Sequence, residues 1–592
     1  MNARYSVGID LGTTNSVVSY TLLDEDADLK LLRIPQVIQP GQIESRDSLP
    51  SFLYLPRDGE LESLQTSFEP NPAAGVVGAY AKSQAAENPQ RVVVAAKSWL
   101  CHSGVGRTEA ALPWQSPPEV NKVSAYDCTV RFLSHLVAAW NEQHPDAPLS
   151  DQQVVLTVPA SFAPAARELT HEAAIAAGLP ETFVLLEEPQ AAVYRWLADR
   201  GDRWRETLKP GDVLLVVDVG GGTTDLTLVT VSETDGTLNL QRLAVGNHLL
   251  LGGDNMDLAL AHFVSGRFAD QGHDLDPWQS VSLWHACRDA KEELLRAGGA
   301  DKHTIAVLGR GSSLIGGTIS TEISSGEAGQ LIVEGFFPKC SATDRPEQQS
   351  ASGFQDIGLP YESDAAITKH VAAFLADQSR DDDEQSVTPT HLLFNGGVFR
   401  SDRLRTRMTE TISDWCEQSP QILGGPDDLD TSVAMGAAYY GWNKQRGGIR
   451  IRGGTARSYY VGIETAGLAI PGVPRPLRAL CVAARAMEEG TEAAVPGEQV
   501  GVVVGKPAQF RFFSSAVRAD DTAGSKLDRW SADELVELEP VTVSLTSESA
   551  GSETFVPVQF VSRITELGMF ELWCHATGSD ERWKMEFNTR ES

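Results

Sequence analysis

The sequence predicts an α/β protein made of two related halves, followed by a smaller all-β unit. Three observations support this fold class. An apolar strand, an aspartate, a Gly/Thr turn and a second strand occur at residues 5–20 and again at residues 213–230. Helical patterns lie between and after the two copies, which indicates sheets covered by helices. Beyond residue 458, only short strand-like runs separated by turn residues follow.

The two copies match in detail. Asp10 follows an apolar strand and leads into the turn at 12–15, and Asp218 does the same before the turn at 220–223. The offset is 218 − 10 = 208 residues, which indicates an internal duplication of domain size. The helical pattern at 163–177 ends at a glycine, a usual stop signal for a helix. We also expect a helix over residues 280–297.

These paired turns are suited to phosphate chemistry. Glycine lets backbone N–H groups approach phosphate oxygens, and consecutive N–H groups in a turn form an anion-binding concavity. Threonine hydroxyls add donors, and Asp10 and Asp218 can hold a hydrated Mg²⁺ against the phosphates. Either turn alone is equally consistent with a Gly-rich hairpin that binds nothing. Two copies favour a di- or triphosphate clamped between the halves.

Composition and charge exclude several other classes. The net charge is 49 − 80 = −31, so nucleic acids and anionic membranes would be repelled. No apolar stretch approaches the roughly 18–20 residues needed to cross a bilayer, and the N-terminal residues lack the apolar core of a signal peptide. The seven cysteines form no C-x-x-C pair. We therefore expect a cytoplasmic protein with free thiols, and neither nucleic acid nor membrane as a partner.

The chain divides by pattern into a two-lobed α/β part and a β-rich part. We expect the α/β part at 1–445, with lobe I at about 1–205 and lobe II at about 206–425. Residues 446–457 are rich in Gly and Arg and are interpreted as a linker, and residues 458–592 form the β-rich unit.

Several motifs together resemble those of one family. Residues 7–16 and 218–225 resemble the first and second phosphate motifs of the actin-like ATPase superfamily. Within it, the match is to the DnaK-like heat-shock protein 70 chaperones. Residues 158–162 with Arg167 resemble the coupling segment of that family, and residues 187–192 resemble its connecting motif. The resemblance covers residues 4–443 almost continuously.

The resemblance implies an actin-like fold with ribonuclease H-like halves that binds ATP or ADP with Mg²⁺ and hydrolyses ATP. The implied catalytic residues are Lys97, Glu188, Asp218 and Asp10, of which Asp10, Glu188 and Asp218 would hold Mg²⁺ through its waters. The implied coupling pair is Pro159 and Arg167. The implied nucleotide-binding residues are Gly12, Thr13, Thr14, Asn15, Gly220, Gly221, Gly222, Thr223, Gly252, Gly253, Lys291, Gly396, Gly397, Arg400 and Asp430.

The adenosine side departs from the family pattern at two places. Lys291 stands where the family has a ribose-contacting lysine, but the residue three positions earlier is Arg288 rather than Glu. Val398 and Phe399 follow the Gly-Gly pair where the family commonly has Ser-Thr, while Arg400 keeps a side chain able to stack on a base. These departures bear on nucleotide affinity and base selectivity, and leave the phosphate chemistry intact.

The β-rich unit also resembles part of the family. Residues 461–467, 568–572 and 582–587 are similar to strands of the peptide-binding β-domain of these chaperones. The implied partners are unfolded or extended polypeptides, with co-chaperones as further candidates. The family's Leu-rich linker is replaced by the Gly/Arg segment, and its helical lid is absent from the pattern. A basic, Gly-rich segment is not expected to bury itself on the ATPase domain in the same way as an apolar linker, so we expect altered coupling. Without a lid, we expect fast peptide release in both nucleotide states.

Three functions follow from these patterns. The favoured one is a DnaK-like chaperone ATPase. The second is a nucleotide-sensing or filament-forming actin-like ATPase in which the β-rich unit is an interaction module. The third is a small-molecule kinase of the same superfamily, since fold alone does not fix function. Lys97, the Glu188-Pro189 motif and the β-rich unit count against the kinase.

Overall fold

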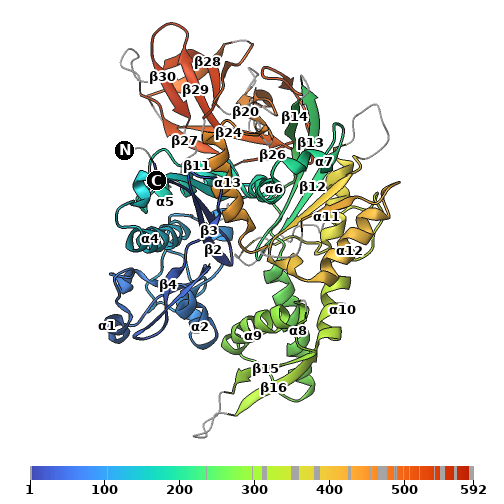
Figure 1. Ribbon diagram of the computed structural model, residues 1–592. Helices are drawn as coiled ribbons and strands as arrows, with labels where there is room; N and C mark the ends of the chain where they lie inside the picture. Colours follow the sequence, from blue (N-terminus) through green and yellow to red (C-terminus); the bar gives the residue numbers. More distant parts are fainter. Residues whose placement is uncertain are drawn as a thin grey trace.

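The computed structural model contains two α/β lobes and a β-rich unit that lies across one end of both (Figure 1). The structure describes residues 3–585 apart from 103–104, 235–236, 297, 310–316, 348–358, 360, 379–386, 425–428, 453–454, 456, 465–475, 486, 488–489, 498, 506, 519, 539, 547–553 and 566–569. In the part of the chain so described, no helix is long and apolar enough to cross a membrane.

Lobe I is built on a sheet in the order β11-β10-β1-β2-β3, with β6 paired to β2. Its strands are β1 (Tyr5–Leu11), β2 (Asn15–Leu22), β3 (Lys30–Leu31), β6 (Leu49–Pro50), β10 (Gln153–Val158) and β11 (Val184–Glu187). Alternate residues of β10 face opposite cores, as strand geometry requires. Val154 and Leu156 pack in one core with residues of α4 (Ala125–Gln143) and α5 (Pro164–Ala176). Val155 packs in the other with residues of α6 (Glu188–Arg200) and α13 (Ser432–Gln445).

Lobe II repeats the plan in a sheet of order β18-β17-β12-β13-β14-β19. Its strands are β12 (Val213–Val219), β13 (Thr224–Thr234), β14 (Thr237–Val245), β17 (His391–Asn395), β18 (Gln421–Leu423) and β19 (Ile451–Arg452). In both lobes the aspartate-bearing strand pairs antiparallel with its hairpin partner and parallel with a strand on the other side. The predicted duplicated α/β fold is confirmed by this shared topology.

Smaller elements extend each lobe away from the β-rich unit (Figure 1). In lobe I they are β4 (Ile34–Gln39), β5 (Gln42–Arg46), β7 (Leu53–Tyr54), α1 (Leu61–Leu64), β8 (Val76–Val77), α2 (Ala79–Glu87), β9 (Val92–Val93) and α3 (Ala96–Leu100), and α7 (Trp204–Thr207) precedes lobe II. In lobe II they are α8 (Gly253–Asp270), α9 (Pro277–Leu295), β15 (Lys302–Leu308), β16 (Thr318–Ser324) and α10 (Ser325–Phe336), whereas α11 (Ile367–Ala376) and α12 (Asp402–Ser413) pack against the central sheet. The expected helices at 163–177 and 280–297 correspond to α5 and α9.

The β-rich unit consists of two packed sheets. One has the order β25-β21-β20-β24-β26 with β27 paired to β24, and the other has the order β22-β28-β29-β30 with β23 paired to β28. The strands are β20 (Ser458–Glu464), β21 (Leu477–Ala483), β22 (Glu492–Ala494), β23 (Val500–Val504), β24 (Pro507–Ser515), β25 (Lys526–Leu527), β26 (Val536–Glu537), β27 (Val541–Ser544), β28 (Thr554–Ile564), β29 (Phe570–Ala576) and β30 (Arg582–Met585). Ala165 of α5 packs into their shared core, so lobe I contacts this unit directly. Residues 465–467, 568–569 and 586–587, on which part of the β-domain resemblance depends, lie outside the described residues.

The Gly/Arg segment behaves differently from the sequence expectation. Ile451 lies in β19, which pairs parallel with β14 of lobe II, and its side chain is buried. Ile449 is partly buried against the same core, whereas Arg450 between them is exposed. The segment expected as a linker at 446–457 therefore includes a short strand of the lobe II sheet. Alternation along an extended segment lets two isoleucines pack while the arginine between them stays in solvent.

Candidate functional site

A cavity of about 390 Å³ lies between the two lobes. It is lined by most of the residues that the sequence predicts for a nucleotide site: Asp10, Gly12, Thr13, Thr14, Asn15, Lys97, Glu188, Asp218, Gly220, Gly221, Thr223, Gly253, Lys291, Gly396, Gly397, Arg400 and Asp430. These residues are far apart in the chain, and the duplicated topology brings them together.

The two Gly/Thr turns face each other across this cavity. A Cβ atom added to Gly221 would lie 2.0 Å from the Thr14 hydroxyl, and one added to Gly222 would lie 2.9 Å from the Thr13 methyl carbon. Glycine therefore leaves room here for the Thr13 and Thr14 side chains of the facing turn, and is not needed for an unusual backbone angle. Opposed turns of this kind present N–H and hydroxyl donors to a ligand from both sides.

Asp10 and Asp218 occupy equivalent positions in the two sheets. Thr157 on the parallel neighbour of β1 donates to Asp10 at 3.1 Å, and Asn395 on the parallel neighbour of β12 donates to Asp218 at 2.7 Å. Burial and the nearby charge of Glu188 raise the pKa of Asp10 to about 7. Burial, again with Glu188, also raises the pKa of Asp218 well above its usual range. A cation beside these two carboxylates would therefore favour their ionised forms.

Lys97 and Glu188 form an ion pair at the lobe I wall of the cavity. Lys97 lies on α3, and Glu188 is the first residue of α6, whose Pro189 is favourable in a first helical turn. Burial alone would lower the pKa of Lys97, but the carboxylates of Glu188 and Asp10 outweigh it and raise that pKa. The lysine is therefore a fixed positive charge inside a mainly acidic cluster.

Asp225 belongs to the same cluster and was not predicted as a site residue. It is 2% exposed, accepts a hydrogen bond from the Ser161 hydroxyl, and is among the charges that raise the pKa of Glu188. The sequence does contain a signal for it. At the equivalent position of the first repeat, 225 − 208 = 17, the residue is the buried Val17. A charged residue at a position where the first repeat has an apolar one indicates a role other than packing.

The side of the cavity where the family resemblance would place adenosine holds a buried ion network. Arg288 pairs with Asp254 at 2.6 Å and with Asp257 at 2.9 Å. Lys291 pairs with Asp257 at 2.6 Å and donates to the Gly253 carbonyl at 2.8 Å. The arginine that departs from the family pattern is thus neutralised by two aspartates, which sequence reasoning did not identify. The predicted stacking residue Arg400 is more exposed and pairs with Asp430 at 2.8 Å.

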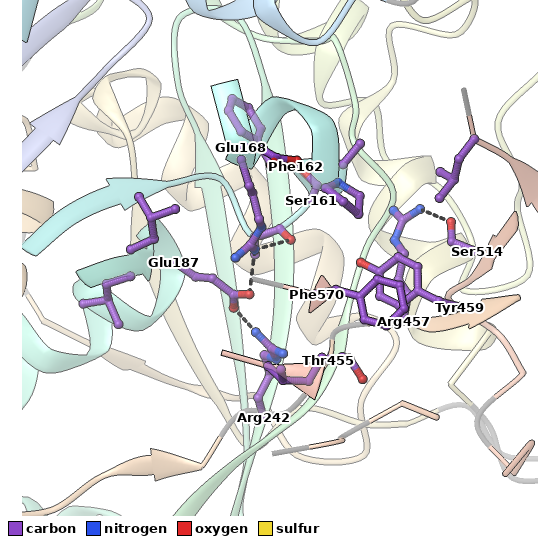
Figure 2. Close-up of a pocket in the computed structure, with 18 of the residues that line it drawn as sticks. Ser161, Phe162, Glu168, Glu187, Arg242, Thr455, Arg457, Tyr459, Ser514 and Phe570 are labelled. Carbon is purple, nitrogen blue, oxygen red and sulfur yellow. Dashed lines mark hydrogen bonds and ion pairs between the residues drawn. The ribbon is translucent and has the colours of Figure 1, made fainter. Parts of the chain in front are cut away.

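Four predicted residues lie outside the lining. Gly222 and Gly252 support it, because an added Cβ at Gly252 would lie 2.7 Å from the Gly220 carbonyl. Pro159 is buried at the end of β10. Arg167 lies at a second pocket, where it pairs with Glu187 at 2.9 Å; Figure 2 labels Glu187 in this pocket.

The charges of the cavity fit a divalent cation. In the cluster around Lys97, the carboxylates of Asp10, Glu188, Asp218 and Asp225 oppose that one lysine, an imbalance of 1 − 4 = −3 when all are ionised. Among the described residues, no group of three or more His, Cys, Asp or Glu side chains is placed to hold a metal directly. Mg²⁺ commonly keeps several waters and takes only one or two carboxylates together with phosphate oxygens. Water-mediated binding by Asp10, Glu188 and Asp218 stays a prediction.

The duplicated sheets and the cavity between them define an actin-like ATPase fold followed by a β-rich region. A family model described as "Hsp70 protein" matches residues 65–307. "Chaperone protein DnaK" of Stenotrophomonas maltophilia (strain R551-3) is 28% identical over 311 residues. That match covers 49% of this chain and 43% of the relative, so it spans less than half of either protein. Together the two matches support an Hsp70-family protein, as the motifs predicted.

Proposed function

We propose that this protein binds Mg-ATP between its lobes, hydrolyses it, and uses its β-rich unit to bind extended polypeptide or a protein partner. The observation that carries the proposal is the convergence of both Asp-Gly-Thr turns and the Lys97–Glu188 pair on one cavity. The family match supports the nucleotide, since Hsp70 proteins in general bind ATP or ADP with Mg²⁺. Coupling to polypeptide depends on the β-rich unit, which lies beyond the residues that the family model matches.

Hydrolysis of a γ-phosphate requires positioning and charge neutralisation more than covalent help from the protein. The turns at 12–15 and 220–223 would cradle the phosphates with N–H and hydroxyl donors. Mg²⁺, held through water by Asp10, Glu188 and Asp218, would neutralise charge on the phosphate oxygens. Lys97 would place a positive charge beside the γ-phosphate and help to orient the attacking water.

Single-turnover hydrolysis of Mg-ATP tests this proposal. We expect Lys97→Ala to slow the chemical step by about 10²–10³-fold, the usual effect of removing one preorganised charge or donor. Lys82→Ala is the matched control, because Lys82 forms only a partly exposed contact with Asp289 at 3.8 Å. Equal rates for wild type and Lys97→Ala would remove the assigned catalytic role.

An extended apolar peptide in the same assay tests the second half of the proposal. Faster hydrolysis with peptide would support a chaperone cycle in this chain. Hydrolysis that requires Lys97 but ignores every peptide would instead favour the nucleotide-sensing alternative, in which the β-rich unit serves another protein partner.

A further inference from the structure

One serine of lobe I is hydrogen-bonded to two side chains of lobe II. Ser161 lies in the turn between β10 and α5, and Figure 2 shows it at the wall of the second pocket. Its hydroxyl donates to the carboxylate of Asp225 on β13 and lies 2.7 Å from Nδ1 of His248, in the segment between β14 and α8. The three side chains thus form one hydrogen-bonded chain that joins the lobes. No role for Ser161 or His248 follows from the phosphate motifs.

The position of each proton in this chain follows from the number of donors. A carboxylate only accepts hydrogen bonds, and the Ser161 hydroxyl has a single proton, which it gives to Asp225. The contact with His248 therefore requires that Nδ1 of the ring carries a proton and donates to the Ser161 oxygen. Burial, together with the charges of Arg457 and Lys97, lowers the pKa of His248 to about 4, so the ring is neutral at pH 7. Its Nε2 then carries no proton, and this atom is buried and has no hydrogen-bond partner among the described residues.

Aromatic packing holds the His248 ring in this orientation. The rings of Phe162 and His248 meet edge to face, with their centroids 5.8 Å apart and an angle of 77° between their planes. Phe162 is buried, and Nζ of Lys97 lies 6.0 Å from the centroid of its ring. One turn of lobe I therefore supplies both the hydroxyl that bridges the chain and the ring that packs against its histidine.

Asp225 is the end of this chain that belongs to the nucleotide site. It lies opposite Asp218 in the β12–β13 ladder, and opposed residues of neighbouring strands have their side chains on the same face of a sheet. Burial lowers the pKa of Lys97, and the charge of Asp225 is among those that raise it. Burial raises the pKa of Asp225 itself, and the Ser161 hydroxyl is the largest influence that opposes this. Loss of that hydroxyl would therefore free the carboxylate to rotate and favour its neutral form.

We propose that Ser161 and His248 are positioning residues for ATP hydrolysis and that they act through Asp225. This rests on the proposed function, since it concerns the nucleotide bound between the lobes. His248 orients the Ser161 hydroxyl, and that hydroxyl holds the Asp225 carboxylate within the catalytic cluster. Because Ser161 belongs to lobe I and Asp225 to lobe II, the same bond also fixes the two lobes relative to each other at this point. A misplacement of about 1 Å in such a cluster can slow the chemical step by about 10²-fold.

Single-turnover hydrolysis of bound Mg-ATP tests this role, with the Kd of Mg-ATP measured separately. We expect Ser161→Ala to slow the chemical step by about 10–100-fold and to change the Kd by less than about 3-fold. His248→Leu should slow it by about 10-fold, whereas His248→Asn, which is similar in size but keeps an N–H donor, should stay within about 3-fold of wild type. Ser150→Ala, at an exposed position, is the matched control and should keep the wild-type rate. Equal losses in the Leu and Asn variants, or a loss of ATP affinity in place of rate, would overturn the proposal.

Double variants test whether the effect passes through Asp225. In an Asp225→Asn background, Ser161→Ala and His248→Leu should each slow the chemical step by less than about 2-fold more, because the group that they position is already changed. Losses that simply multiply would mean that the two residues act by another route, and they would contradict the proposal.

The proton on His248 gives a readout that needs no hydrolysis. Nitrogen-15 NMR of histidine-labelled protein distinguishes a neutral ring protonated on Nδ1 from one protonated on Nε2, and His248→Asn identifies the signal by its loss. We expect the proton on Nδ1 at pH 7 in wild type and a shift toward the other tautomer in Ser161→Ala. A proton on Nε2 in wild type would overturn the chain, because Ser161 would then donate to His248 and not to Asp225. Absence of ATP hydrolysis by wild type would instead refute the proposed function, and this signal would still report on the chain.

Discussion

Glu187→Gln should be one of the most destabilising single changes in the chain. Glu187 holds Arg167 of lobe I and Arg242 of lobe II, and the three side chains are only 9%, 13% and 4% exposed. Both arginines hold the pKa of Glu187 below its usual range although burial opposes them. Removing one partner of a buried ion pair leaves an uncompensated charge, which typically costs about 3–5 kcal/mol. Because these side chains keep some exposure to solvent, we expect Glu187→Gln to lower the free energy of unfolding by about 3 kcal/mol.

Urea unfolding followed by tryptophan fluorescence measures this loss. Glu206→Gln is the matched control, because its side chain is exposed, and it should change stability by less than about 0.5 kcal/mol. Glu187 has a lowered folded-state pKa, so its contribution is present above its unfolded pKa near 4.3 and disappears as the pH falls through the folded value. The gap between wild type and Glu187→Gln should therefore narrow below roughly pH 4. A loss under about 1 kcal/mol at pH 7 would refute the reasoning.

Two further changes test packing and linker docking. Gly436→Ala would place a Cβ atom 1.8 Å from the Ala191 carbonyl oxygen, where α13 crosses α6. We expect this clash to lower the free energy of unfolding by about 1–3 kcal/mol. Gly266→Ala, which has open space around it, is the control and should be neutral or slightly stabilising. Ile451→Asp should release β19 and make the Gly/Arg segment much more sensitive to trypsin, while Ile43→Asp at a 54% exposed position should leave cleavage unchanged. Undiminished stability in the first case, or unchanged cleavage in the second, would contradict the packing described.

The fold could be predicted from sequence because its main signal is local and repeated. Asp10 and Asp218 each follow an apolar strand and precede a Gly/Thr turn, so two independent windows report the same unit. The cavity residues followed from that repeat and from the family resemblance. Asp225 closes the second motif at 218–225 and was given no role, because only comparison with Val17 in the first repeat marks it as a charge at an otherwise apolar position.

Contacts between segments that are far apart in the chain could not be predicted from the sequence. The composition of residues 446–457 suggested a solvated linker, because Arg and Gly outnumber the two isoleucines in this segment. Whether Ile451 is buried depends on the edge of β14, some 200 residues earlier in the chain. The short Ile449-Arg450-Ile451 alternation alone does not say which strand edge covers the two isoleucines.

The most direct test of the central claim is Mg-dependent ATP hydrolysis by Asp10→Asn and Asp218→Asn, measured side by side. If the two halves build one phosphate site, each substitution removes a Mg²⁺-orienting carboxylate, and both should lose most of the hydrolysis rate with a higher Mg²⁺ requirement. Asp26→Asn, at an exposed position of the β2–β3 turn, is the matched control and should keep the wild-type rate. Loss in only one of the two variants, or in neither, would contradict a single nucleotide site shared by the duplicated lobes.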